Sequence, residues 1–240
     1  MELNGARTLV VGATGVLGGK LSRALHDAGA QLAVAGRDQE RLDQLSADLG
    51  GVWIERVDVL DGFEPNLVVD QAAEALGGLD LLVVAVGVAA FGSADDTTDE
   101  TIDELFRVNT MAPAALVRAG LPHLGEGGTV AVLSAILADY PTAEMGAYSA
   151  SKAAMSAWLT ALRHEQRRRG VTVFDIRPQH METGLADRAI AGTPPKMPPA
   201  QDADMTVDRI VDGLRGDARE LHYDMGSGEI VTVGSKRASS

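Results

Sequence analysis

The sequence contains no cysteine among its 240 residues. This absence excludes disulfide bonds, thiol catalysis and metal sites built on cysteine, and it agrees with a cytoplasmic location. No apolar run reaches the 18 residues that a membrane-spanning helix needs, and the N-terminus lacks a charged segment followed by a cleavable apolar stretch. We therefore expect a soluble cytoplasmic protein that does not act at a membrane.

Positive charge is also scarce, because 21 Lys and Arg stand against 34 Asp and Glu and the formal net charge is -13. A phosphate polymer would be repelled, so nucleic acid is not an expected partner. The one basic cluster, 163–169, is better explained as a helix C-terminus closed by Gly170. His123, His164 and His180 lack partners at metal-ligand spacing, and no metal site is expected.

Short apolar runs of strand length alternate with amphipathic segments along the chain. Nearly continuous apolar runs are typical of strands buried on both faces. The expected strands are 8–11, 32–35, 52–57, 81–86, 129–133 and 171–176. The expected helices are 20–28, 39–49, 65–76, 98–116 and 148–169, with Gly29, Gly50 and Gly77 at C-terminal ends. This alternation predicts an α/β fold, a Rossmann-type doubly wound parallel sheet, in a single domain of residues 1–240.

Two segments near the C-terminus are expected to be irregular. The Pro-rich stretch 192–199 reads as a long surface connection, and the tail 234–240 as a frayed end.

A glycine-rich turn joins the first expected strand to the first helix. The N–H groups of a helix N-terminus can hold a pyrophosphate where glycines let it approach the backbone. The spacing Gly-x-x-Gly-x-x-Gly differs from the usual dinucleotide pattern, and a tight turn with positive φ would also explain the glycines. The position at the first strand–helix junction favours nucleotide binding. The expected contact residues are Gly12, Thr14, Gly15, Val16, Leu17 and Gly18.

Gly36-Arg37-Asp38 follows the second expected strand. An acidic residue directly after that strand would accept a hydrogen bond from the ribose 2′-hydroxyl of NAD, whereas an arginine neutralises the 2′-phosphate of NADP. Arg37 therefore favours NADP, with NAD as the alternative. Arg37 as a solvated loop residue and Asp38 as the N-cap of the next helix are equally compatible with the pattern.

Tyr148 and Lys152 lie four residues apart at the start of an expected helix and so share one helical face. A nearby cation favours a phenolate and lowers the tyrosine pKa, which would suit the pair to general acid/base chemistry. Tyr-x-x-x-Lys is frequent by chance, and a surface lysine beside a half-buried tyrosine is the simpler explanation when the pair stands alone.

Five features in the right order resemble the short-chain dehydrogenase/reductase family over essentially the whole chain. They are the 12–18 turn, Asp58-Val59, Gly87, Val108-Asn109 and Tyr148-Ser149-Ala150-Ser151-Lys152. The resemblance implies an NAD(P)-dependent oxidoreductase, usually a homodimer or homotetramer, that moves a hydride between nicotinamide and an alcohol or carbonyl carbon of a small molecule.

The resemblance also implies roles for individual residues. Tyr148 would be the general acid/base, Lys152 would hold the nicotinamide ribose and lower the tyrosine pKa, and Asn109 would position a water that continues the proton path. Asn109 bonded locally to backbone, and Asp58 as a turn residue, are the alternatives. The residues that would line the cofactor are Asp58, Val59, Ala85, Gly87, Pro178 and Thr183.

One departure from the family concerns the substrate-binding serine expected thirteen residues before the tyrosine. That position is Ala135, and Ser134 stands one place earlier. Either a one-residue insertion brings Ser134 into a catalytic role, or the role is vacant, since neighbours on an extended segment point to opposite faces. Thr142 or Tyr140 are further candidate hydroxyls.

Other departures are milder. Val84-Ala85-Val86 replace a polar strand end, and Gln179 follows Pro178 where a glycine is usual. The segment 179–200 is the expected substrate loop, and its apolar residues favour a hydrophobic carbonyl or alcohol. The alternative to an enzyme is a catalytically impaired dinucleotide-binding sensor or scaffold on the same fold.

Overall fold

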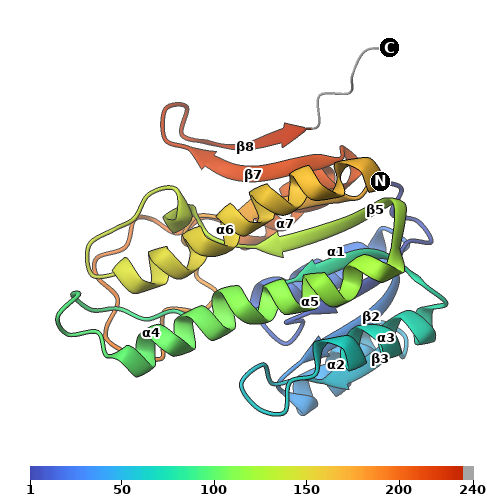
Figure 1. The fold of residues 1–240 in the computed structure, drawn as a ribbon, viewed down its shortest axis with the longest axis horizontal. Coiled ribbons are helices and arrows are strands. Elements are labelled where there is room, and N and C mark those ends of the chain that lie inside the picture. Colours follow the sequence, from blue (N-terminus) through green and yellow to red (C-terminus); the bar gives the residue numbers. More distant parts are fainter. Residues whose placement is uncertain (235–240) are drawn as a thin grey trace.

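A single eight-stranded sheet organises the chain, and the computed structural model describes residues 1–234 (Figure 1). The strand order is β3-β2-β1-β4-β5-β6-β7-β8, with β8 antiparallel to β7 and all other neighbours parallel. The strands are β1 Arg7–Val11, β2 Gln31–Gly36, β3 Trp53–Arg56, β4 Leu79–Val84, β5 Leu124–Leu133, β6 Thr172–Arg177, β7 Ala218–Asp224 and β8 Glu229–Gly234. The expected doubly wound sheet is confirmed.

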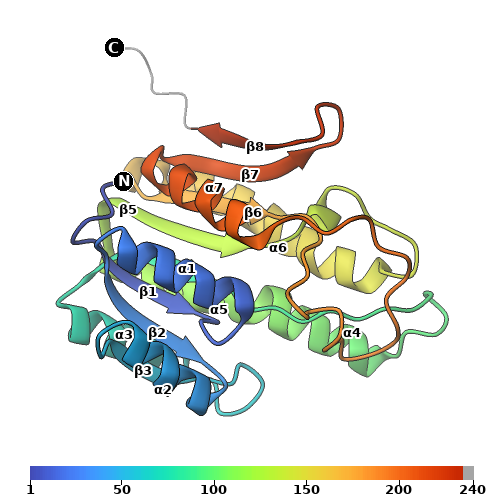
Figure 2. The same ribbon diagram turned by 180° about the vertical axis from the view of Figure 1, so that it is seen from behind.

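Helices cover both faces of this sheet (Figures 1 and 2). The α-helices are α1 Val16–Asp27, α2 Gln39–Asp48, α3 Pro65–Leu76, α4 Asp99–Phe106, α5 Ala112–Gly120, α6 Gly146–Gln166 and α7 Ala203–Arg215. Buried leucines of α1, α2 and α7 pack in one apolar core, whereas α3, α5 and α6 pack in a second core on the opposite face. Strands covered on both faces need apolar residues at every position, which explains their continuous apolar runs.

The order of the strands reverses between β1 and β4. The chain winds outward from β1 through β2 to β3, then crosses back to place β4 on the other side of β1. In such sheets a crevice opens at the carboxyl ends of the strands where the winding reverses. The glycine-rich turn follows β1, and Gly87 follows β4, so the fold brings both to this edge.

The long helix expected at 98–116 is interrupted. Residues Arg107–Met111 form a π-helical turn between α4 and α5. A π-turn widens the helix by one residue and frequently marks a functional site. Asn109 lies at its centre.

The strands β7 and β8 were not expected from the sequence. Their residues are partly exposed and carry charges, because β8 is the sheet edge and β7 lies beside it. The alternation of apolar and polar residues in β7 and β8 is too weak to distinguish these segments from loops. The stretch 192–199 is irregular as expected, and of the tail predicted at 234–240 only Gly234 falls within the described residues, as the last residue of β8.

Candidate functional site

Tyr148 and Lys152 occupy one face of α6, at the carboxyl edge of the sheet. Only 6% of Tyr148 and 4% of Lys152 is exposed, so neither is a surface residue. Tyr148 packs among apolar residues that include Phe91, Ala135 and Met145. Within residues 1–234 the Tyr148 hydroxyl has no hydrogen-bonding partner, which leaves it available to a ligand. The surface-lysine explanation of the Tyr-x-x-x-Lys pattern is therefore wrong.

Burial dominates the ionisation of both residues. It raises the pKa of Tyr148 to about 12. It lowers the pKa of Lys152 to about 8, and the negative charge of Asp175 opposes that shift. Burial alone raises the pKa of Tyr148, because desolvation disfavours the phenolate, and a lowering of this pKa by Lys152 stays a prediction. With its pKa raised in this way, the phenol of Tyr148 is protonated at neutral pH.

The ammonium group of Lys152 lies in a tight backbone environment. Its Nζ donates to the carbonyl of Leu133, 3.2 Å away at the end of β5. A Cβ added to Gly87 would stand 3.1 Å from Nζ and 3.3 Å from the Asn109 side-chain oxygen. A side chain at Gly87 would therefore crowd Lys152 and Asn109 where they approach the chain that follows β4.

Asn109 braces that same chain. Its Oδ1 accepts from Val88 N and its Nδ2 donates to Val88 O, both at 2.9 Å, and Nδ2 also donates to Ser151 Oγ at 3.0 Å. The bonds reach across the fold, so the alternative of a purely local backbone contact is wrong. Because the amide protons are committed, any part of Asn109 in a proton path has to use its backbone carbonyl or the second lone pair of Oδ1.

Ser134 and Ala135 face opposite sides of the segment that follows β5. Ala135 is extended, with φ -166 and ψ 158, and its methyl group packs in the same apolar cluster as Tyr148. Ser134 Oγ donates to Asp175 Oδ1 at 2.5 Å, in the interior between β6 and α6. A hydroxyl has one proton, and this one is held by a carboxylate. The assignment of Ser134 as donor to the substrate is corrected: the position that faces Tyr148 carries no hydroxyl.

The other hydroxyls of the loop do not replace it. Thr142 is exposed and donates to the carbonyl of Tyr140, and Tyr140 is itself 44% exposed. Neither belongs to the cluster around Tyr148.

The N-terminus of α1 has the features of an anion site. Gly15 is the N-cap, no side chain caps the helix, and no acidic residue lies in the first turn. The first intrahelical bond is that from Gly19 N to Gly15 O, so the N–H groups of Val16, Leu17 and Gly18 have no backbone acceptor in the helix. The cofactor expected from the sequence has its pyrophosphate at such a terminus, and the residues present fit that group.

Two of the glycines in this turn are dictated by packing. A Cβ on Gly12, which has φ +91, would lie 2.6 Å from the backbone of Ala85, and a Cβ on Gly18 would lie 2.2 Å from the carbonyl oxygen of Gly12. The turn is thus pressed against the end of β4 and onto itself. The tight-turn explanation is thus confirmed, and nucleotide binding at the helix terminus that the turn exposes stays a prediction.

Arg37 is exposed at the end of β2 and has no ion-pair or hydrogen-bond partner within the described residues. Asp38 is the N-cap of α2, where its side chain accepts from Arg41 N at 3.1 Å, as expected. Arg41 was missed by the sequence reasoning. Its guanidinium contacts the Asp38 carboxylate at 3.2 Å and the Thr14 carbonyl at 3.4 Å. Only its spacing of four from Arg37 could have indicated it.

The remaining residues expected at the cofactor lie at the same edge of the sheet, and their hydrogen bonds involve backbone groups. Asp58 Oδ1 accepts from Leu60 N at 3.0 Å, which makes it a turn residue, and Val59 packs between the apolar clusters. The carbonyl of Pro178 accepts from Ile136 N at 2.9 Å, and Thr183 N donates to Met181 O at 2.8 Å. Contact of these residues with a cofactor stays a prediction.

The expected substrate loop folds back over Tyr148. Leu185, Ala186, Ala189, Ile190, Ala191 and Met197 pack against the buried cluster that contains the tyrosine. Hydrogen bonds from Phe91 N to Ala191 O and from Ile190 N to Ala89 O join this loop to the segment after β4. The surroundings of the Tyr148 hydroxyl are therefore predominantly apolar.

Comparison with known proteins agrees with this geometry. The short chain dehydrogenase family profile matches residues 6–193. This chain belongs to the short-chain dehydrogenase/reductase family. It is 31% identical over 198 residues to the dehydrogenase/reductase SDR family member 7B of Mus musculus, covering 78% of this chain and 61% of that protein. The chain thus spans about three fifths of that relative's length.

Solved structures give the same family and fold. A short chain dehydrogenase from Burkholderia cenocepacia in complex with NADP is 30% identical, with a TM-score of 0.79, covering 89% of this chain and 92% of the other. A family member from Burkholderia phymatum in complex with NAD has a TM-score of 0.83 at 22% identity, covering 92% and 90%, and shows the shared fold. These are oxidoreductases of the family to which the chain belongs. Among the described residues, no helix has the length and apolar character to span a bilayer.

The burial of Lys152 predicts a gain in stability when its charge is removed. The lowered pKa corresponds to an unfavourable contribution on the order of 3 kcal/mol below pH 8. Lys152→Met conserves volume, loses the Leu133 hydrogen bond, and is expected to raise the free energy of unfolding at pH 7 by about 1–2 kcal/mol.

The sign of the pH dependence follows from linkage. Between about pH 8 and pH 10.5 the unfolded wild type binds the lysine proton and the folded state does not, so wild-type stability from this group rises with pH. The advantage of Lys152→Met should therefore disappear near pH 10.5. Urea unfolding at pH 7, 9 and 10.5 measures this, and a variant less stable than wild type at pH 7 would contradict it.

Proposed function

We propose that this protein is an NADP-dependent reductase or dehydrogenase that transfers a hydride between the nicotinamide and a carbonyl or alcohol carbon of an apolar small molecule. The observation that carries the proposal is the buried side chain of Tyr148, whose hydroxyl has no hydrogen-bonding partner among residues 1–234, one helical turn from buried Lys152. NADPH would supply the hydride in reduction and NADP⁺ would accept it in oxidation, and the protein's own residues would bind and orient the reactants and move the proton.

Tyr148 would donate its phenolic proton to the substrate oxygen during reduction and accept it during oxidation. A phenol with a pKa of about 12 is protonated at neutral pH, so the structure is prepared for donation. Lys152 would hold the ribose hydroxyls of the nicotinamide and favour the phenolate as it forms. Asn109 would keep the chain after β4 in place and offer its backbone carbonyl to the proton path.

The proposed cofactor contacts follow the carboxyl edge of the sheet. The N–H groups at the start of α1 would bind the pyrophosphate, with Gly12 and Gly18 setting the turn. Asp58 and Val59 would border the adenine, and Ala85 and Gly87 would lie along the backbone beside the cofactor. Pro178 and Thr183 would approach the nicotinamide.

Preference for NADP over NAD rests on two arginines. Arg37 is an exposed cation without a partner among residues 1–234, and Arg41 reaches over the glycine-rich turn to the Thr14 carbonyl. A 2′-phosphate beside them would gain charge-assisted hydrogen bonds. The NADP complex of the Burkholderia cenocepacia relative supports this choice.

Replacement of the unpaired arginine tests the cofactor. Arg37→Ala should weaken NADPH binding by at least tenfold and leave NADH binding within about twofold, because only NADPH carries the 2′-phosphate. NADPH and NADH fluorescence titrations measure both constants. Arg209→Ala, at an exposed position of α7, is the control for loss of a surface arginine. An equal loss for both cofactors would rule out Arg37 as the phosphate ligand.

Chemistry is tested by NADPH oxidation against a panel of aldehydes, ketones and quinones. Tyr148→Phe keeps the ring and removes the proton donor, so turnover should fall by about 10² to 10⁴ while NADPH binding persists. Turnover unchanged in Tyr148→Phe would overturn the assignment of the acid. Failure of wild type to bind either nucleotide would overturn the function altogether.

The absence of a hydroxyl at Ala135 leads to a prediction that turnover rises when a hydroxyl is added. Loss of one oxyanion-type donor typically lowers the rate by about 10² to 10³. Ala135→Ser puts a hydroxyl on the Tyr148 side of the chain and should raise kcat by at least tenfold. Ala135→Val, which adds bulk without a donor, is the matched control and should not raise it.

Ala135 is also the reason to keep a second candidate function, a dinucleotide-binding sensor or scaffold that turns over slowly or not at all. Retention of a buried Tyr148 beside Lys152 favours the enzyme, because nucleotide binding alone makes no use of the phenol. Binding of NADPH without turnover in wild type, together with turnover gained by Ala135→Ser, would favour the sensor.

We also propose a homodimer or homotetramer of cytoplasmic location, with α5 and α6 pairing across a two-fold axis. Met111, 63% exposed just before α5, supports an apolar contact there. Light scattering after size exclusion measures the mass, and a monomer at micromolar concentration would contradict this proposal.

A further inference from the structure

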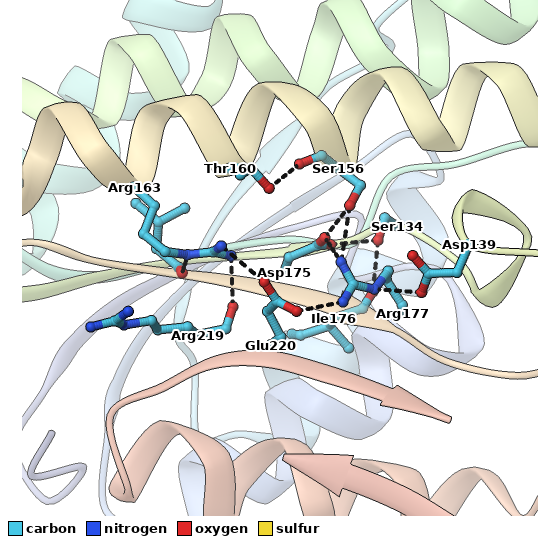
Figure 3. Close-up of polar contacts among 11 residues, drawn as sticks. Ser134, Asp139, Ser156, Thr160, Arg163, Asp175, Ile176, Arg177, Arg219 and Glu220 are labelled. Carbon is cyan, nitrogen blue, oxygen red and sulfur yellow. Dashed lines mark hydrogen bonds and ion pairs between the residues drawn. The ribbon is translucent and has the colours of Figure 1, made fainter. Parts of the chain in front are cut away.

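A buried polar cluster lies behind the candidate active site, between α6 and the strands β6 and β7 (Figure 3). Its centre is Asp175, whose side chain is fully buried, beside Arg177, which is 7% exposed. Arg177 makes ion pairs with three carboxylates, and Arg163 pairs with one of the same three. The members of this Asp175 cluster are Ser134, Asp139, Ser156, Arg163, Asp175, Arg177 and Glu220.

The sequence places these groups together by simple periodicity. Asp175 and Arg177 are two residues apart on β6 and so point to the same face, toward α6. Ser156 and Arg163 are seven residues apart on α6, which is two helical turns, and so lie on one line of the helix. The polar line of α6 thus lies against the polar pair of β6, beside the apolar core.

Stability alone does not explain such a cluster. Desolvation of buried charges offsets most of their mutual attraction, and well-packed apolar residues of the same volume would be about as stable. The other buried positions of β6 are apolar, namely Val173, Phe174 and Ile176. The charged pair is therefore worth examining for what it does to its neighbours.

Asp175 joins the two elements that hold Lys152. Its Oδ1 accepts from Ser134 at the end of β5, and its Oδ2 accepts from Ser156 on α6, each at 2.5 Å. One residue before Ser134 is Leu133, whose carbonyl accepts from Lys152, and Lys152 is one turn before Ser156. The Lys152–Leu133 bond and the Ser156–Asp175–Ser134 bridge are therefore two adjacent links between the same helix and the same strand end.

Asp175 is also the charge that acts on Lys152. Three uncharged groups surround the ammonium of Lys152. They are the Leu133 carbonyl of β5, Gly87 in the chain after β4, and the neutral amide of Asn109 in the π-turn. On α6 itself the neighbour is the neutral phenol of Tyr148. From β6 the charge of Asp175 raises the pKa of Lys152 against the effect of burial. Asp139 and Glu220 are held by Arg177, on the far side of Asp175.

We propose that Asp175 is a positioning residue of the candidate active site, which clamps α6 to the end of β5 and supplies the negative charge that keeps Lys152 an ammonium group beside Tyr148. This proposal rests on the proposed function for its consequence in turnover. Its effect on Lys152 is a property of the folded chain and is measured without turnover.

The chain contains four lysines, 20, 152, 196 and 236, which makes a direct test practical. Protein labelled with ¹³C at the lysine ε-carbon gives one signal per lysine, and Lys152→Met assigns the signal of interest. Titration of that signal between pH 6 and pH 11 gives the midpoint of Lys152. Asp175→Asn removes the charge and keeps the shape, and should lower the midpoint by about one pH unit.

Glu220→Gln is the matched control, because it removes a carboxylate from the same Arg177 without touching either link to Lys152. In Glu220→Gln the titration midpoint of Lys152 should stay within about 0.3 pH unit of wild type, because the charge that is removed makes no contact with Lys152. Equal shifts in Asp175→Asn and Glu220→Gln, or no shift in Asp175→Asn, would overturn the proposal. Thermal unfolding by circular dichroism establishes that each variant is folded.

Should Asp175→Asn fail to fold, Arg177→Gln answers the same question with the opposite sign. Removing the cation that shares Asp175 makes the field at Lys152 more negative, so the midpoint should rise. A midpoint that falls or stays unchanged would overturn the proposal.

Turnover then separates this proposal from the proposed function. If wild type oxidises NADPH, the alkaline limb of its pH–rate profile should move to lower pH in Asp175→Asn by the same amount as the NMR midpoint, and Glu220→Gln should keep the wild-type limb. A limb that stays fixed while the NMR midpoint moves would overturn the link to catalysis. Absence of turnover in wild type would count against the proposed function and leave the NMR result to decide the role of Asp175.

Discussion

A lysine ammonium that is kept charged inside a nearly dry protein is the constraint on which the carboxyl edge of this sheet depends. A buried ammonium loses its hydration and therefore needs hydrogen-bond acceptors and a countercharge close by. The Leu133 carbonyl is the hydrogen-bond acceptor, and Asp175 supplies the countercharge. A side chain at Gly87 would crowd Lys152 Nζ, and Asn109 hydrogen-bonds the same stretch of backbone at Val88. Several positions with no chemistry of their own are thus specified by one charge.

Most of the fold could be predicted because the inner strands are buried on both faces. Such strands leave continuous apolar runs, and the glycines at the helix ends have positive φ, as at Gly77 and Gly170. The outer strands β7 and β8 could not be predicted in this way, since an edge is solvated and its residues resemble a loop. The π-turn was missed for another reason. Its extra residue follows from how Asn109 is held by Val88 and Ser151, contacts that no helical periodicity contains.

The candidate site was predictable where chemistry fixes a spacing along one element. Tyr148 and Lys152 on one helical face, and the glycines at the start of α1, are of this kind. Asp175 lies inside the apolar run 171–176 and Arg177 directly after it, and neither is recognisable from the sequence as a buried charge, because that requires its partners to be known. Those partners come from four other segments of the chain, separated by 19 to 43 residues in the hydrogen bonds that join them. Arg41 was overlooked similarly, since its contact with Thr14 spans two strand–helix units.

Ser134 and Ala135 are neighbours whose side chains point in opposite directions, so a hydroxyl would act differently at each position. On the extended chain after β5 the side chain at 135 faces Tyr148 and that at 134 faces β6. A hydroxyl at 135 would assist the substrate oxygen, whereas a hydroxyl at 134 hydrogen-bonds the carboxylate that acts on Lys152. This chain has its serine at the second place and a methyl group at the first. In the proposed mechanism this site maintains the cation beside the tyrosine, and Tyr148 would be the one hydroxyl that polarises the substrate.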